Sequence, residues 1–322
     1  MKKVKKNIKC KICDGKLISW YKNLFDDRHG YKGKFDVEKC INCGFGQTSP
    51  QLSRSKIAKL YENYYPWKKI DITSVKRAQF KMPNKTTIWR KGLYINGQYK
   101  VKPNTTVLDV GCGLGHSLLE LESIGCKAYG VDPDKNALKL ARKFNLNFKV
   151  GFVEDNPFPK IKFDYIIANQ VLEHTNDPLI FLKTLKKRLN QNGKIVISFP
   201  NVNSITRYLL NENWLHWHIP YHLNFFNKNS INLISKKSGL KIERLKTITP
   251  NMWTNLQIRR MLQSPKMGDR DLFWDGKSTN RELYNQGILP KIIYFLEEYN
   301  FLNRIIDTAG YGESYILTLS KI

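Results

Sequence analysis

Long apolar runs are missing from this 322-residue chain. Its longest, such as residues 195–199, are far too short to span a bilayer, which takes about 20 apolar residues in a helix. The basic start at residues 1–6 has the charge of a signal peptide, but no apolar segment follows it. We therefore expect a cytoplasmic protein without a transmembrane segment.

Acidic residues are scarce, because 27 Asp and Glu stand against 54 Lys and Arg, giving a formal net charge of +27. Such an excess fits a nucleic-acid partner or peripheral contact with an anionic surface. The excess is mostly Lys and runs along the whole chain, so a general composition bias explains it equally well. Nucleic acid stays open as a partner, behind a small-molecule or glycan acceptor. The sequence does not indicate an oligomeric state.

Cysteine is also sparse, with six residues, yet four of them form two Cys-x-x-Cys pairs. Two such pairs present four thiolates, which is what a tetrahedral structural zinc ion requires. The 26-residue spacer between the pairs exceeds the usual range of about 15–20, which indicates a zinc ribbon with a long hairpin arm. A disulfide is the weaker alternative in a cytosolic protein. The predicted ligands are Cys10, Cys13, Cys40 and Cys43.

Four segments differ in pattern, and no internal repeat is present. Residues 1–50 are the zinc-ribbon module, and residues 51–100 form an aromatic, basic and mostly helical connector. Residues 101–248 alternate strand and helix patterns and form the core. Residues 249–322 are a helical extension whose final strand, near residues 314–320, completes the core sheet.

The core predicts parallel strand–helix–strand units. Strands are expected at residues 106–110, 127–131, 163–168 and 194–199, with helices at 117–123 and 135–144 between them. A further helix follows Asp177, with Pro178 at its first position, and is expected to end near Gly193. This alternation indicates an α/β fold with a doubly wound, Rossmann-like sheet.

A Gly-rich turn, Val107-Leu-Asp-Val-Gly-Cys-Gly-Leu-Gly115, follows the first core strand. Gly111, Gly113 and Gly115 let the backbone turn sharply and approach a ligand. Asp109 stands at the strand tip, where it would repel a pyrophosphate but attract the ammonium of a methionine moiety. No Lys-Ser/Thr follows the turn, which excludes a P-loop, and the spacing differs from the dinucleotide Gly-x-Gly-x-x-Gly.

The next strand ends at Asp132-Pro133, about 20 residues after the glycines. An acidic residue at this tip is placed to accept both ribose hydroxyls of a nucleoside. Asp132 also fits a helix cap for the segment that begins at Pro133, and the two roles are compatible.

The Gly-rich turn, the segment from Phe163 through Glu173-His174 to Asn176-Asp-Pro178, and residues 193–201 and 222–226 resemble the class I S-adenosylmethionine (SAM) methyltransferases. The resemblance is closest to the branch with the ubiquinone O-methyltransferases and many sugar and natural-product enzymes. It implies SAM as cofactor and a seven-stranded sheet. It also implies contacts to the cofactor from Asn169.

Two departures stand out from this family. Phe152 takes the place of the usual acidic residue after the third strand, so it is expected to stack on adenine while Glu154 or Asp155 makes the polar contact. Members of the ubiquinone branch hold a divalent metal through Glu-x-x-Glu-His. Gln170 replaces the first Glu here, which argues against metal-assisted catalysis.

Histidines dominate the predicted acceptor side. His174, just past a strand tip, is the leading candidate base, and a structural role is equally plausible; Glu173 would orient it or contact the cofactor. Residues 214–222 are dense in aromatics and His and are expected to form a lid, with His218 and His222 as secondary candidates. Residues 214–222 themselves contain no Cys or acidic residue, so packing is preferred to metal binding.

Together these features predict methyl transfer from SAM to a hydroxyl, with an amine or carbon less favoured, of a sugar, nucleotide-sugar or other small metabolite. Bacterial surface-glycan biosynthesis is one setting suggested by the resemblance. An RNA methyltransferase is the first alternative, supported by the charge. A non-catalytic SAM-binding protein is the second, and the intact glycines argue against it.

Overall fold

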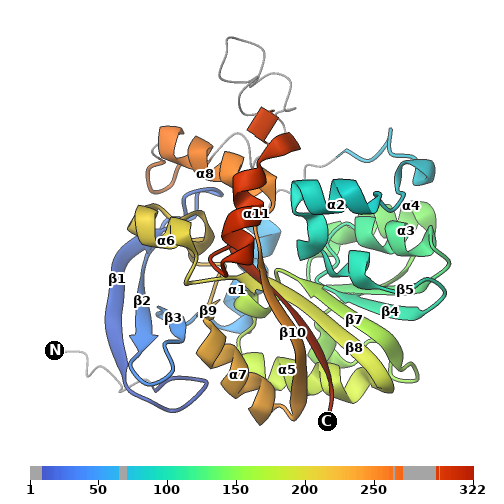
Figure 1. Ribbon diagram of the computed structural model, residues 1–322, viewed down its shortest axis with the longest axis horizontal. Helices are drawn as coiled ribbons and strands as arrows, with labels where there is room; N and C mark the ends of the chain where they lie inside the picture. The colour runs from blue at the N-terminus through green and yellow to red at the C-terminus, as the bar shows by residue number, and fades with distance from the viewer. Residues whose placement is uncertain (1–8, 65–70, 264, 271–294, 297) are drawn as a thin grey trace.

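The computed structural model describes residues 9–64, 71–263, 265–270, 295–296 and 298–322. Most of these residues form two sheets with helices around them (Figure 1). Among them, no helix has both the length and the apolar character needed to cross a bilayer.

The larger sheet has seven strands in the order β10-β11-β8-β7-β4-β5-β6. The five strands from β8 to β6 are parallel, and β11 pairs antiparallel with both β8 and β10. This arrangement confirms the predicted α/β class and the seven-stranded sheet. The strands are β4 (Thr106–Val110), β5 (Lys127–Asp132), β6 (Asn147–Val150), β7 (Phe163–Asn169), β8 (Leu189–Pro200), β10 (Leu240–Ile248) and β11 (Ser314–Lys321).

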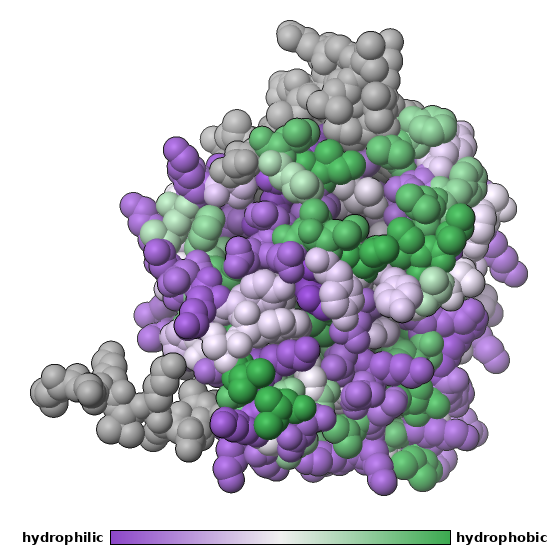
Figure 2. Space-filling view, turned by 60° about the vertical axis from the view of Figure 1, so that its left-hand side comes forward, coloured by the Kyte–Doolittle hydropathy of each residue, from purple (hydrophilic) through white to green (hydrophobic). Residues whose placement is uncertain are grey.

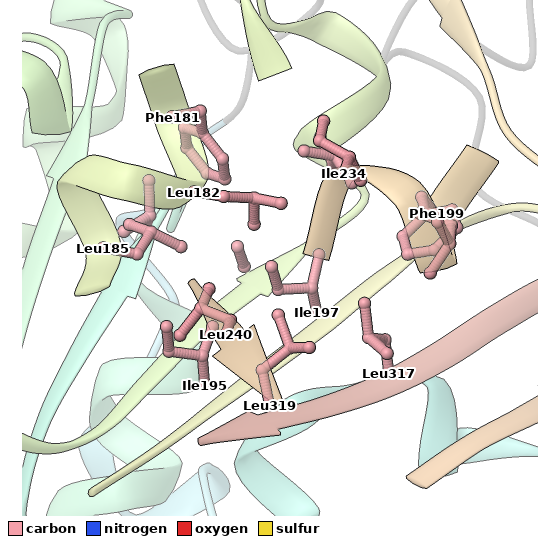
Figure 3. Close-up of a cluster of buried hydrophobic side chains, with 14 of the residues drawn as sticks. Phe181, Leu182, Leu185, Ile195, Ile197, Phe199, Ile234, Leu240, Leu317 and Leu319 are labelled. Atoms are coloured by element: carbon pink, nitrogen blue, oxygen red, sulfur yellow. The ribbon is translucent and has the colours of Figure 1, made fainter. Parts of the chain in front are cut away.

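Successive side chains of a strand point to opposite sides, and this sheet carries buried apolar side chains on both faces. Helices cover both faces for this reason. In β8, Ile195 and Ile197 pack with α5 (Pro178–Arg188) and α7 (Lys228–Lys237), whereas Val196 packs with the cluster on the other face. Figure 3 shows the first of these clusters between β8, β11 and the two helices. The second cluster includes α3 (His116–Glu122) and α4 (Leu138–Phe144).

Helix α5 begins as predicted but ends earlier. Asp177 accepts hydrogen bonds from the N–H groups of Leu179 and Ile180, and Pro178 opens the helix. The prediction that it continues to near Gly193 is wrong, because α5 ends at Arg188 and β8 begins at Leu189. The early strand is held by pairing of Leu189 with Phe163 and by a 2.6 Å hydrogen bond from Asn190 Nδ2 to Asp164 Oδ1.

A smaller four-stranded sheet joins the N-terminal residues to the core. Its order is β1-β2-β3-β9, and the long β1–β2 hairpin forms the left side of Figure 1. The first three strands are consecutive, while β9 comes from the segment after β8. The strands are β1 (Leu17–Phe25), β2 (Lys34–Cys40), β3 (Gly46–Ser49) and β9 (Asn224–Phe225).

The remaining helices are α1 (Arg54–Tyr64) and α2 (Lys85–Lys91) in the connector, α6 (Ile205–Leu210) in the core segment, and α8 (Asn251–Gln263) and α11 (Phe301–Thr308) in the C-terminal extension. Short 3-10 helices are Arg77–Gln79, Leu93–Ile95, Gly97–Lys100, Lys135–Ala137, Val153–Asp155, Leu172–His174, Asn211–Asn213 and Leu215–Trp217. Part of the predicted helical extension falls outside the described residues. Figure 2 shows a mostly hydrophilic face with hydrophobic residues gathered in its upper half.

Candidate functional site

The Gly-rich turn lies at the carboxyl end of β4, where the sheet order reverses between β4 and β7. Ligands of open α/β sheets bind at this crevice. Gly111, Gly113 and Gly115 have positive φ angles of 71°, 52° and 87°. A Cβ atom on Gly111 would lie 2.5 Å from Cγ2 of Val171, so the turn contacts the loop that follows β7. Glycine therefore permits both the turn and its close packing.

Asp109 is a buried carboxylate with an unused oxygen. Its Oδ2 accepts a hydrogen bond from the Ser117 hydroxyl, whereas Oδ1 has no hydrogen-bond partner within the described part of the chain. Burial is the main reason that the pKa of Asp109 rises to about 7. A partnerless buried carboxylate oxygen fits a cationic ligand, because an ammonium group would satisfy it.

Asp132 ends β5 beside the same turn. Its Oδ2 accepts from the N–H of Gly113 at 2.9 Å, and its Oδ1 accepts from the N–H of Asp134 at 2.9 Å. Each oxygen keeps a second lone pair, so the side chain can still accept ribose hydroxyls. Burial raises the pKa of Asp132 to about 6. The predicted neighbour Pro133 is half-buried.

The segment after β6 holds the two residues predicted at the adenine. The guanidinium of Arg54, from α1, lies 3.7 Å from the ring centroid of Phe152. Arg54 also pairs with Asp155 at 2.7 Å. Burial raises the pKa of Glu154. Arg54 thus contacts the aromatic ring on which adenine was expected to stack, and no sequence pattern had indicated it.

Asn169, at the end of β7, is engaged within the protein. Its Oδ1 accepts from the N–H of Gly97 at 2.6 Å, and its Nδ2 donates to Gln98 Oε1 at 3.0 Å. The prediction that Asn169 contacts the cofactor gains no support from this arrangement. Through these two hydrogen bonds, the amide of Asn169 holds the 97–100 turn against the carboxyl end of β7.

Four of the six histidines form one buried cluster of rings. The ring centroids of His174 and His222 are 4.6 Å apart, and those of His218 and His222 are 4.9 Å apart. His29 joins from the β1–β2 hairpin, 5.6 Å from His218. The structure therefore brings the three predicted catalytic histidines together and adds one that sequence reasoning missed.

Glu173 lies beneath this cluster with no solvent exposure. Its Oε1 is 4.0 Å from Nε2 of both His174 and His222. Burial holds the pKa of Glu173 well above its usual range. Burial also lowers the pKa of His174 to about 4, and the nearby Arg28 adds to this effect. We call Glu173, His174 and His222 the histidine–glutamate centre.

Tyr61 of α1 also reaches this centre. Its hydroxyl oxygen lies 2.9 Å from Nδ1 of His174, and its ring meets that of Tyr221 edge-on. The sequence around Tyr61 shows only a helix pattern, so nothing in it distinguished this tyrosine from its neighbours.

The N-terminal sheet holds the 214–222 segment in place. Strand β3 pairs with β9, and the hydroxyl of Thr48 donates to the carbonyl of His222 at 2.7 Å. Arg28 donates to the carbonyl of Leu215. Asp26 shapes the loop that carries Arg28, because it accepts three backbone N–H groups. The predicted lid is thus a buried wall of the site that is shared between two sheets.

The four predicted zinc ligands converge. Sγ–Sγ distances are 3.6 Å for Cys10–Cys43 and 3.4 Å for Cys13–Cys40, and all four sulfur atoms lie within 4.8 Å of one another. A tetrahedral ion with Zn–S bonds of about 2.3 Å places its sulfurs about 3.8 Å apart. The four residues therefore fit zinc after a small adjustment.

The Gly-rich turn after β4 and the histidine–glutamate centre after β7 lie in neighbouring loops at the same end of the sheet. Residues 86–245 match a family model described as a methyltransferase domain. The ubiquinone biosynthesis O-methyltransferase of Bradyrhizobium diazoefficiens is 33% identical over 30% of this chain and 40% of its own length. The tRNA U34 carboxymethyltransferase of Shewanella sediminis is 27% identical over 57% of each chain.

The chain thus spans about half the length of these curated relatives. A solved complex of the Haloferax volcanii Trm112 methyltransferase activator with a methyltransferase is also similar, at 16% identity and a TM-score of 0.45, covering 72% of this chain and 89% of that one. Just under half of the chain, residues 86–245, therefore resembles the methyltransferase domain family, and the curated relatives named above are methyltransferases.

Proposed function

We propose that the protein transfers the methyl group of SAM to a hydroxyl of a small acceptor, with a sugar or nucleotide-sugar as the preferred class. The observation that carries this proposal is the histidine–glutamate centre, which lies directly after β7 while Val171 of the same loop contacts Gly111 in the cofactor turn. A nucleophile at this centre would therefore stand next to the cofactor.

The residues that would hold SAM are those of the crevice. Asp109 would bind the ammonium, Asp132 the ribose hydroxyls, and the turn of Gly111, Gly113 and Gly115 would accommodate the methionine moiety. Phe152 and Glu154 would flank the adenine. The guanidinium of Arg54, which now covers the Phe152 ring, would have to move away or stack on the adenine. SAM supplies an activated methyl group, so the protein has to align the acceptor and remove its proton.

The surroundings of the centre favour a neutral, ring-shaped acceptor. Burial keeps the imidazoles uncharged, since the pKa values of His218 and His222 lie well below the usual range. Tyr221 is buried beside it, with its carbonyl 2.9 Å from Nδ1 of His174 and its ring stacked on that of His218. Aromatic rings and neutral imidazoles suit the faces and hydroxyls of sugars better than they suit phosphates. The acceptor hydroxyl would lose its proton at the histidine–glutamate centre.

Two variants test the assignment by separating binding from turnover. In Asp132→Ala, calorimetry should show that SAM binding is largely lost. In His174→Ala, SAM affinity should persist while turnover falls, measured with labelled SAM and a pool of sugars and nucleotide-sugars. Full activity of His174→Ala would show that His174 is not needed for proton removal. Unchanged SAM affinity of Asp132→Ala would show that Asp132 does not bind the cofactor.

Nucleic acid is the second candidate acceptor. It is favoured by the net charge of +27 and by relatives named tRNA U34 carboxymethyltransferases. Labelled methyl incorporation into tRNA, persisting at high salt with a sequence preference, would support it. Nonspecific phosphate contacts would instead fade as salt rises. Loss of all turnover with SAM binding intact would favour a binding protein without catalysis.

We also propose a structural zinc ion at the four cysteines. Such a site is closed by its four thiolates and stabilises the fold without taking part in the chemistry. Freshly purified protein should hold zinc at this site. A chelator should remove the ion and thereby destabilise the module. Metal analysis that finds much less than one equivalent would refute the ribbon.

A further inference from the structure

Helix α11 presents its apolar side chains to solvent and its polar ones to the protein. Asn303 and Arg304 are buried, whereas Phe301, Leu302 and Ile305 are 51%, 62% and 67% exposed. A helix at the surface of a globular protein normally has the opposite arrangement. Apolar side chains that gather on the outside of a protein indicate a contact with another molecule.

Polar contacts hold α11 in this orientation. Asn303 Nδ2 donates to Oδ1 of Asn251, on α8, at 3.2 Å. Arg304 donates to the carbonyl of Trp89, on α2, at 2.9 Å and to the carbonyl of Thr249. A rotation of α11 that buried its apolar side would break these bonds and take polar groups from their partners. In Figure 1, α11 accordingly stands between α8 and α2.

Exposed aromatic rings extend the outer side of α11. The ring of Trp89 lies 6.1 Å from that of Phe301, and the ring of Phe295 lies 5.4 Å from that of Tyr299. The guanidinium of Arg90, next to Trp89, lies 4.8 Å from the Tyr299 ring centroid and so links the two pairs. We call this set the apolar face, and its members are Trp89, Phe295, Tyr299, Phe301, Leu302 and Ile305.

We propose that the apolar face joins two copies of this chain in a dimer with two-fold symmetry. An aromatic side chain buries roughly 150–250 Å² in full, so six that are about half exposed offer about 600 Å² per copy. Two copies would bury about 1,200 Å² in total, which reaches the range of specific interfaces. In a two-fold contact the same surface serves both chains, so one continuous face is sufficient.

The charges beside the apolar face favour a second copy over an anionic membrane. Arg90 and Lys91 both pair with Glu298, and Arg304 pairs with Asp307. These cations are therefore neutralised within the chain, whereas a lipid surface is attracted by free Lys and Arg groups. Two copies with a net charge of +27 each repel one another unless they meet across a face of low charge.

Sedimentation velocity of the full chain tests the dimer. The wild type should sediment with twice the mass of one chain at micromolar concentration and dissociate on dilution. Leu302→Glu and Ile305→Glu should each raise the dissociation constant roughly 100-fold, because two unpaired carboxylates would be buried at the two-fold axis. Both side chains are exposed, so circular dichroism of each variant should match the wild type.

Ile180→Glu is the matched control. Ile180 is 54% exposed and lies on α5, at the bottom of Figure 1 and away from α11, so this variant should remain a dimer. High salt should leave the dimer intact, since screening weakens the repulsion between the copies.

Three results would overturn the proposal. The wild type could be a monomer throughout the micromolar range, or a dimer that neither Leu302→Glu nor Ile305→Glu weakens. It could also be a monomer that floats with vesicles of phosphatidylglycerol and phosphatidylcholine and loses this binding in Leu302→Glu, which would identify a membrane as the partner. The dimer does not depend on the proposed function, because mass is measured without SAM or acceptor.

Discussion

The affinity of the protein for SAM should fall steeply as the pH falls from 7.5 to 5. In the proposed site two buried carboxylates would face the cationic cofactor, and burial raises the pKa of Asp109 to about 7 and that of Asp132 to about 6. A cation binds the ionised forms, so protonation competes with binding. Affinity is therefore high above pH 7 and is lost as the pH falls through first one pKa and then the other.

The size of this effect follows from the two pKa values. At pH 5, about one Asp109 in a hundred and about one Asp132 in ten are ionised. If only the doubly ionised protein binds, the dissociation constant rises roughly 800-fold from pH 7.5 to pH 5, or ~4 kcal/mol. This is an upper bound, because a protonated carboxyl can still accept or donate a hydrogen bond.

Calorimetric titration across this range is the assay, and below pH 7.5 the amino group of SAM stays largely protonated. In Asp109→Asn the affinity should be lower at pH 7.5, and its remaining pH dependence should centre near pH 6. The same variant should raise the melting temperature of the cofactor-free protein, because it removes a carboxylate that burial disfavours. An affinity for the wild type that stays constant from pH 7.5 to pH 5 would refute the electrostatic reasoning.

Three further predictions concern single contacts. Gly111→Ala should lower SAM affinity and should destabilise the protein more than Gly310→Ala does. Both glycines have positive φ, but of the two only Gly111 has an atom within 2.5 Å of the added Cβ. Equal melting temperatures of the two variants would contradict this. Thr48→Val removes the hydrogen bond to the His222 carbonyl and should lower stability by about 1 kcal/mol and slow turnover, with SAM affinity unchanged in calorimetry. Arg54→Ala should change SAM affinity by freeing the ring of Phe152, whereas Lys56→Ala, on the same helix and exposed, should not.

The sequence predicted the sheet and the Gly-rich turn well because both depend on local signals. The apolar strands, the glycines and the caps such as Asp177 act within a few residues of one another. The end of α5 was misjudged because Gly193 looked like a helix terminator. The pairing of Leu189 with Phe163, 26 residues earlier, starts the strand before that glycine.

The candidate site was only partly predictable, since its contacts join distant segments. Glu173 and His174 were found from the motif, and His222 from the density of histidines, but their convergence depends on the path of residues 175–221. The contribution of the N-terminal sheet had no sequence signal at all. Strand β9 has two residues, too few for any pattern, yet it pairs with β3 and so connects the cysteine module to the histidines.

Because of this connection, we expect the cysteine module to affect the proposed acceptor side more than the proposed cofactor crevice. Cys40 ends β2, β2 pairs with β3, and Thr48 of β3 holds the backbone at His222. Asp109 and the Gly-rich turn belong to the other sheet and do not share these bonds. Cys40→Ser should therefore impair turnover, as measured with labelled SAM, while cofactor affinity changes little. A parallel loss of both would show that the two sheets unfold as one unit.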